Sequence, residues 1–126
     1  MTTEASQVNY PALVKIDLAT SNLEKMAEFV TQVMCIPLAS QMISGYPHYV
    51  GELGNVTLVL APSEAAGMTP GTPGVHQIHL RVRHIAAVVE RARAMGCTVS
   101  APSALSACIY DPDEHPWMVF EDANAK

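Results

Sequence analysis

The chain has 126 residues and a hydrophobic fraction of 49%, enough for a substantial core, so we expect one domain over residues 1–126. The formal net charge of −5 at pH 7 and the scattered basic residues argue against nucleic acid as a partner. No apolar run approaches the roughly 20 residues of a membrane span, and no basic-then-apolar leader is present, which predicts a cytoplasmic protein with no membrane partner.

The first half opens with a strand and a helix. Residues 14–20 alternate apolar and polar side chains, which is typical of a half-buried strand. Ser21 and Glu24 then form a capping box, which predicts that a helix begins there. Apolar residues recur at helical spacing until Pro37. We therefore expect a strand followed directly by an amphipathic helix.

Three β-prone runs and a connector complete this half. The runs cover residues 38–43, 46–52 and 56–60. Glycine and proline then interrupt every periodicity over residues 62–73. We expect a first repeat at about 12–61 and a linker at about 62–73.

The second half repeats this order of elements. Residues 76–82 align with residues 14–20, and an apolar stripe that starts at Ile85 predicts a helix ending at Gly96. Short β-prone runs follow at residues 98–100, 107–110 and 117–121. Each half is therefore predicted to be a βαβββ repeat, the second over about 74–122.

Polar and charged side chains share one side of the two aligned strands. Strand alternation places Leu18 and Leu80 against the helices and the alternate residues on the opposite side. Those residues are Lys15, Asp17, Ala19, Gln77, His79 and Arg81. Buried charge is costly without a partner, so this composition indicates the wall of a ligand cavity. The structural alternative is that Asp17 pairs with Lys15 or Arg81.

A turn motif near the C-terminus adds to the paired repeats. Asp111, Pro112 and Asp113 match the start of a family motif, and with the two halves they make residues 13–122 resemble the vicinal oxygen chelate superfamily. Its members include glyoxalase I, extradiol dioxygenases, fosfomycin-modifying enzymes and bleomycin-resistance binding proteins. The resemblance implies an α+β fold in which two βαβββ repeats form a curved mixed sheet around a pocket.

The motif itself predicts a tight turn before the last strand. Asp111 and Asp113 are expected to be structural residues of that turn. Glu114 and His115 replace the Gly and Asn that are usual in the family, and we expect His115 to lie exposed. Trp117 should face the helices as a core residue.

The resemblance also indicates where a metal would bind. The positions that usually hold metal ligands in the family are occupied here by Lys15, Thr57, Gln77 and Met118. Divalent metals in such sites prefer imidazole and carboxylate, which this set does not supply. We therefore predict no metal and no other cofactor.

His79 is the best candidate for proton transfer, with Asp17 as the group that would orient it. The wider set of residues expected to bind ligand combines polar, cationic and apolar side chains. It consists of Lys15, Gln77, His79, Arg81, Tyr49, Tyr110, Met118 and Phe120.

Three functional hypotheses follow from these residues and the resemblance. The first is a metal-free protein that binds, and so sequesters, a small aromatic or amphipathic molecule. The second is a metal-independent enzyme that uses His79 and Asp17. The third is a lyase, isomerase or dioxygenase with displaced metal ligands. The resemblance also implies a homodimer, and exchange of halves would place Lys15 and Gln77 of one pocket on different copies.

Overall fold

A computed structural model describes residues 11–67 and 77–122 of the chain. The first half contains β1 (Lys15–Thr20), α1 (Leu23–Glu28), the π-helix η2 (Phe29–Val33), β2 (Ala39–Ile43), β3 (Tyr46–Leu53) and β4 (Val56–Pro62). The second half contains β5 (Ile78–Val82), α2 (Ile85–Ala94), β6 (Val99–Ser100), β7 (Ser106–Tyr110) and β8 (Pro116–Glu121). The predicted order of elements is confirmed in both halves. Part of the predicted linker, from residue 68 onward, lies outside the described residues.

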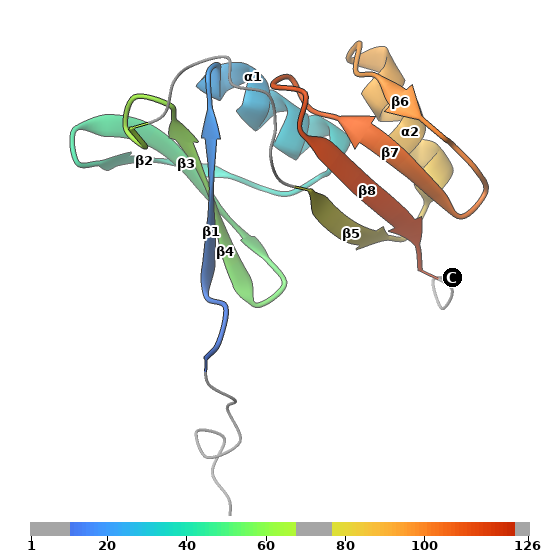
Figure 1. The fold of residues 1–126 in the computed structure, drawn as a ribbon, viewed down its shortest axis with the longest axis horizontal. Coiled ribbons are helices and arrows are strands. Elements are labelled where there is room, and N and C mark those ends of the chain that lie inside the picture. Colours follow the sequence, from blue (N-terminus) through green and yellow to red (C-terminus); the bar gives the residue numbers. More distant parts are fainter. Residues whose placement is uncertain (1–10, 68–76, 123–126) are drawn as a thin grey trace, which may run out of the picture.

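The strands form two four-stranded sheets with the same internal order. One sheet runs β1-β4-β3-β2 and the other β5-β8-β7-β6. In each, the first strand pairs in parallel with the last, and the other pairs are antiparallel. The α+β class and the βαβββ repeats are thus confirmed. The described strands make two separate sheets rather than one continuous curved sheet (Figure 1).

The start of α1 differs from the predicted capping box. Asn22 is the N-cap, and its side-chain oxygen accepts a hydrogen bond from the backbone N–H of Lys25 at 3.1 Å. Ser21 instead donates its hydroxyl to Asp113 Oδ1 at 2.6 Å, a contact between the two halves. The prediction for Ser21 is therefore wrong, because a partner distant in sequence takes its side chain.

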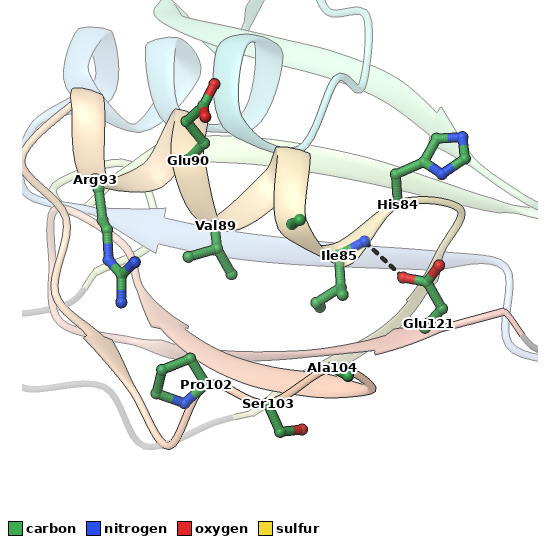
Figure 2. A pocket seen from close by; sticks show the side chains of 10 residues that line it. His84, Ile85, Val89, Glu90, Arg93, Pro102, Ser103, Ala104 and Glu121 are labelled. Atoms are coloured by element: carbon green, nitrogen blue, oxygen red, sulfur yellow. Dashed lines mark hydrogen bonds between the residues drawn. The ribbon is translucent and has the colours of Figure 1, made fainter.

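The second helix agrees with its sequence pattern. Ile85 and Val88 are among its buried residues, and Gly96 has the positive φ of +86° that ends helices readily. His84 is the N-cap residue, but its side chain makes no capping hydrogen bond. The carboxylate of Glu121 accepts the N–H of Ile85 at 2.6 Å instead (Figure 2), so β8 fixes the beginning of α2.

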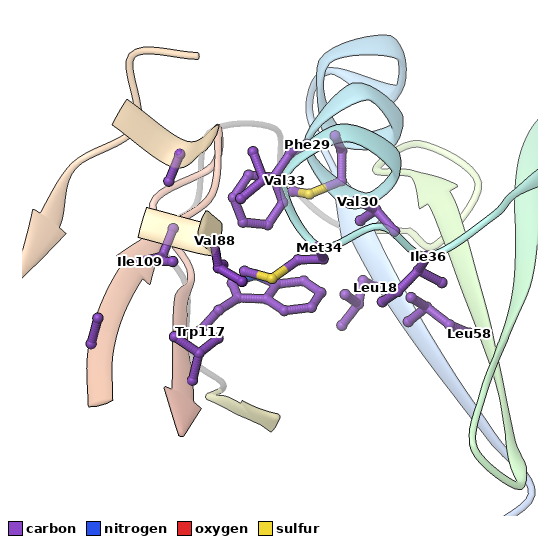
Figure 3. Close-up of a cluster of buried hydrophobic side chains, with 14 of the residues drawn as sticks. Leu18, Phe29, Val30, Val33, Met34, Ile36, Leu58, Val88, Ile109 and Trp117 are labelled. Atoms are coloured by element: carbon purple, nitrogen blue, oxygen red, sulfur yellow. The ribbon is translucent and has the colours of Figure 1, made fainter. Parts of the chain in front are cut away.

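One hydrophobic core runs through both halves (Figure 3). The indole of Trp117 is fully buried, as predicted, and meets the ring of Phe29 from the other half. The guanidinium of Arg91 in α2 donates to the carbonyl of Val33 at 3.0 and 3.2 Å. The helix-facing sides of the two sheets therefore share a core, and the opposite side of each sheet is left open. Among the described helices, none is long and apolar enough to cross a bilayer.

Candidate functional site

The open side of the β5-β8-β7-β6 sheet collects most of the predicted ligand-binding residues. His79 pairs with Met118 and Arg81 with Phe120, and residues paired in this way share a face. The alternate residues Trp117 and Val119 are buried on the helix side. Strand parity also places Tyr110 and Gln77 on the open side. The structure thus brings together Gln77, His79, Arg81, Tyr110, Met118 and Phe120.

The imidazole of His79 is held by two neighbours on this face. Its Nε2 lies 3.0 Å from the amide oxygen of Gln77, and its ring stacks on Phe120 with centroids 5.8 Å apart and planes at 25°. A hydrogen bond at Nε2 to an oxygen acceptor selects the tautomer that carries its proton there. Nδ1 has no hydrogen-bond partner among the residues that the structure describes, which leaves it available to a ligand.

The same face has an apolar platform and a cation. Phe120 is 39% exposed, which is high for a large apolar residue on a strand. Arg81, its neighbour across the β5–β8 pair, is exposed and makes no ion pair with the described residues. The strand residues described on this side include no carboxylate, because Glu121 points to α2. The surface therefore suits a flat anion.

The open side of the β1-β4-β3-β2 sheet carries a paired set of charges. Lys15 Nζ lies 3.6 Å from Asp17 Oδ1, and both side chains are more than half exposed. Thr57, the register partner of Lys15, donates its hydroxyl to Glu52 at 3.2 Å. An exposed ion pair of this kind contributes little stability, about 0–1 kcal/mol. The structural alternative for Asp17, pairing with Lys15, is observed.

His79 and Asp17 are not brought together within one chain. Asp17 lies on β1 and His79 on β5, and these strands belong to different sheets. Among the described residues, Asp17 interacts with Lys15, and His79 interacts with Gln77 and Phe120. A single copy therefore does not contain the predicted acid–base pair.

Tyr49 does not lie on the open side, so its predicted place in the pocket is wrong. It pairs with Leu60 in the row of β3 and β4 that faces the helices, and its hydroxyl donates to Glu24 of α1 at 2.9 Å. This hydrogen bond to a carboxylate raises the pKa of the Tyr49 phenol. The face of Tyr49 follows only from its register with Leu60, because residues 58–61 of β4 are all apolar and buried and show no alternation.

His115 is buried, which contradicts the prediction of an exposed side chain. Its Nδ1 and backbone N–H lie 3.0 and 2.9 Å from the Asp111 carboxylate. That carboxylate also accepts the N–H of Asp113 at 2.9 Å and the indole N–H of Trp117 at 2.8 Å. Asp111 is thus the structural centre of the turn, as predicted. The hydrogen bond to Asp111 raises the pKa of His115, although burial acts in the opposite direction.

The sequence was compared with models of known protein families. Residues 12–119 match the Glyoxalase/Bleomycin resistance protein/Dioxygenase superfamily. The chain belongs to this superfamily. No curated protein matches the sequence.

Solved structures of the superfamily type resemble the chain at low sequence identity. The antibiotic-binding protein TnmS3 of a Streptomyces species is 19% identical with a TM-score of 0.71, over 93% of this chain and 100% of that one. The fosfomycin resistance protein FosX of Listeria monocytogenes, solved with Mn(II), is 16% identical with a TM-score of 0.71, over 92% and 96%. Lactoylglutathione lyase of Agrobacterium tumefaciens is 16% identical with a TM-score of 0.64, over 88% and 93%. These likenesses concern the fold.

The four positions that the resemblance implies for metal ligands are split between the two sheets. Lys15 and Thr57 are neighbours on one sheet, while Met118 and Gln77 belong to the other. They supply an ammonium, a hydroxyl, a thioether and an amide, a donor set that does not fit a divalent first-row metal. Across residues 11–67 and 77–122, no group of three His, Cys, Asp or Glu side chains is arranged to hold a metal ion.

Proposed function

We propose that this superfamily member binds a small, flat organic anion on the open side of the β5-β8-β7-β6 sheet and thereby sequesters it. The observation that carries the proposal is the stack of His79 on the exposed ring of Phe120, with Arg81 beside that ring. The stack offers an aromatic surface, and the guanidinium offers a planar, permanent charge. Gln77 and His79 supply the remaining polar contacts.

A second copy of the chain is needed to close the pocket. The binding face lies on one sheet, and β1 and β5 are each at a sheet edge with one paired neighbour among the described strands. We propose a homodimer in which the β1-β4-β3-β2 sheet of one copy covers the β5-β8-β7-β6 sheet of the other. Lys15, with its partner Asp17, would then join a pocket that contains Gln77 and Arg81. Ligands enclosed on several sides lose most of their exposed surface, which a single open sheet does not achieve.

The comparisons are compatible with this function. TnmS3 is described as an antibiotic-binding protein, so a protein of this fold exists that holds a small molecule. The donor set at the superfamily's metal positions favours binding without a metal. Fold alone does not assign function, and for that reason the proposal rests on His79, Arg81 and Phe120.

The test is a thermal-shift screen of flat aromatic carboxylates and phosphonates, followed by calorimetry on the compounds that stabilise the protein. A compound at 100 times its Kd should add about 2.7 kcal/mol to the free energy of unfolding. Arg81→Gln and Phe120→Ala should each weaken the binding of such a compound. The matched control is Lys25→Gln, which removes an exposed cation on helix α1 rather than on this sheet. If Arg81→Gln and Phe120→Ala both bind the stabilising compounds as tightly as the unchanged protein does, the proposed site is contradicted.

Sedimentation of the unliganded protein tests the second copy. A dimer is expected, and Lys15→Ala should weaken the same ligands as Arg81→Gln if the two sheets face each other. A monomer that binds with full affinity would remove the dimer from the proposal and leave the open face as the whole site.

A metal-independent enzyme is the second candidate, favoured by Nδ1 of His79, which has no partner among the described residues, and by the fold's occurrence in a lyase. In this case Asp17 of one copy would orient His79 of the other. The two candidates differ in how His79→Gln acts. Loss of turnover with binding retained indicates catalysis, whereas loss of affinity alone indicates sequestration. Metal analysis of protein purified without chelators tests the third hypothesis, an enzyme with displaced metal ligands. A tightly held stoichiometric metal would contradict both sequestration without a metal and metal-independent catalysis.

A further inference from the structure

A cavity separate from the open sheet faces lies between α2 and the segment that joins β6 to β7 (Figure 2). Its volume is about 680 Å³, which is within the range of small-molecule sites. Apolar side chains supply most of its walls, with Ile85, Ala86 and Val89 on the helix and Pro102 and Ala104 on the opposite segment. We call this cavity the α2 groove.

Hydrogen bonds hold both walls of the α2 groove in place. On the helix side, Glu121 accepts the N–H of Ile85 at 2.6 Å. On the other side, the hydroxyl of Ser103 accepts the N–H groups of Leu105 and Ser106 at 3.2 and 3.1 Å. The carbonyl of Leu105 in turn accepts the N–H of Glu121 at 2.9 Å. The groove is therefore preformed, and a ligand would not have to order its walls.

One end of the α2 groove carries a cationic side chain without a partner among the described residues. The guanidinium of Arg93 makes no hydrogen bond or ion pair with residues 11–67 or 77–122, unlike that of Arg91, which donates to Val33. Figure 2 shows the side chain of Arg93 extending toward Pro102, and that of Glu90 directed away from it. At the other end, Glu121 is already occupied by Ile85. The two carboxylates of the lining, Glu90 and Glu121, are thus directed away from Arg93 or lie at the opposite end, and the charge at the Arg93 end of the groove is positive.

We infer that the α2 groove is a binding site for a flat hydrophobic monocarboxylate, separate from the open sheet face. Val89 and Pro102 face each other across the groove (Figure 2), which suits a planar hydrocarbon between them. The guanidinium of Arg93 would pair with the carboxylate through two parallel N–H donors. The chemical class follows from these two features, namely an apolar slot and one planar cation at its end.

The experiment titrates 2-naphthoate into the ¹⁵N-labelled full chain and follows the amide shifts of Ala86 and Ala104, with 2-naphthamide as the uncharged probe. The expected result is saturable shifts at these two amides with naphthoate and much weaker ones with naphthamide. Arg93→Gln should weaken binding at these amides roughly tenfold or more, because it removes a charge-assisted contact. Arg83→Gln, an exposed arginine outside the groove lining, should change it less than about twofold.

A second variant tests the cavity independently of the charge. Ala104→Phe places a ring in the groove from an exposed position and should abolish the shifts at Ala86 while the amide spectrum stays folded. The inference is overturned if Arg93→Gln binds naphthoate as the unchanged protein does, if naphthamide binds equally well, or if the shifts occur at His79 and Phe120 instead. That last outcome would assign the probe to the open sheet face, so failure of the groove and failure of the proposed function are distinguishable.

Discussion

The ring of Phe29 lies edge-on to the indole of Trp117, with centroids 5.4 Å apart and planes at 64°. Phe29 belongs to the first half and Trp117 to the second, and both side chains are fully buried. This edge-to-face contact adds to the stability from burial of the two rings. The halves are consequently expected to fold as one cooperative unit rather than as two independent modules.

Phe29→Ala should lower the free energy of unfolding by about 3–5 kcal/mol, because it leaves a large cavity beside Trp117. Urea unfolding followed by tryptophan fluorescence and by far-UV circular dichroism measures this cost. The two probes should give coincident transitions. The matched control is Phe120→Ala, which removes the exposed phenyl ring of the open face and should cost less than about 1 kcal/mol. Equal costs for the two variants would contradict the assignment of Phe29 to the shared core.

Asp111→Ala should destabilise the protein by about 3–5 kcal/mol, the cost typical of removing one partner from a buried charged network. The substitution leaves the indole N–H of Trp117 and two backbone N–H groups without their acceptor. Chemical denaturation measures the loss. Asp111→Asn keeps one acceptor oxygen and should cost less than the alanine variant. An alanine variant as stable as the unchanged protein would show that the network does not hold the turn.

The stabilising effect of His115 should depend on pH. Its pKa is raised in the folded protein, chiefly by the hydrogen bond to Asp111. The protonated form is thus favoured by folding, and this contribution is complete below the unfolded pKa of about 6.5 and lost as pH rises through the raised folded value. Unfolding free energies of the protein and of His115→Gln should therefore differ most at low pH. A histidine titration by NMR with a midpoint at or below the unfolded value would refute this sign.

Gly51→Ala should destabilise the fold by about 1–3 kcal/mol through overpacking. A Cβ at this buried position of β3 would lie 2.5 Å from the carbonyl oxygen of Pro37 and 2.8 Å from a methyl carbon of Leu38. Since one of these atoms is backbone, relief requires the chain before β2 to move. A lower thermal midpoint for Gly51→Ala is the expected result, and an unchanged midpoint would show that the segment at Pro37 adapts freely.

Local patterns predicted much of this fold because they report on neighbouring residues. The alternation in residues 14–20 predicted Leu18 in the core, which is confirmed, and Lys15 on the opposite side of the strand, where its side chain is exposed. Gly96 marked the end of α2 because its positive φ is a property of that one position. The grouping of His79, Arg81 and Phe120 on one face likewise followed from strand parity.

The errors arose where a residue takes its partner from elsewhere in the chain. Ser21 was predicted to cap α1, but Asp113 of the other half accepts its hydroxyl. His115 was expected to be exposed, but the turn folds its imidazole onto Asp111. Residue spacing and secondary-structure propensity do not predict how the two sheets are arranged. That arrangement keeps Asp17 apart from His79 within one copy.

The edge positions of β1 and β5 have a consequence for solubility. An edge strand exposes unpaired backbone groups and is a template for uncontrolled association with other chains, and charged side chains on such strands are a common protection against it. Lys15 lies on β1 and Arg81 on β5. The same two side chains would then contact a ligand and prevent aggregation. Replacing Lys15 or Arg81 by an uncharged residue is therefore expected to alter ligand preference and also to reduce colloidal stability. This double role limits how freely the surface can diverge during evolution.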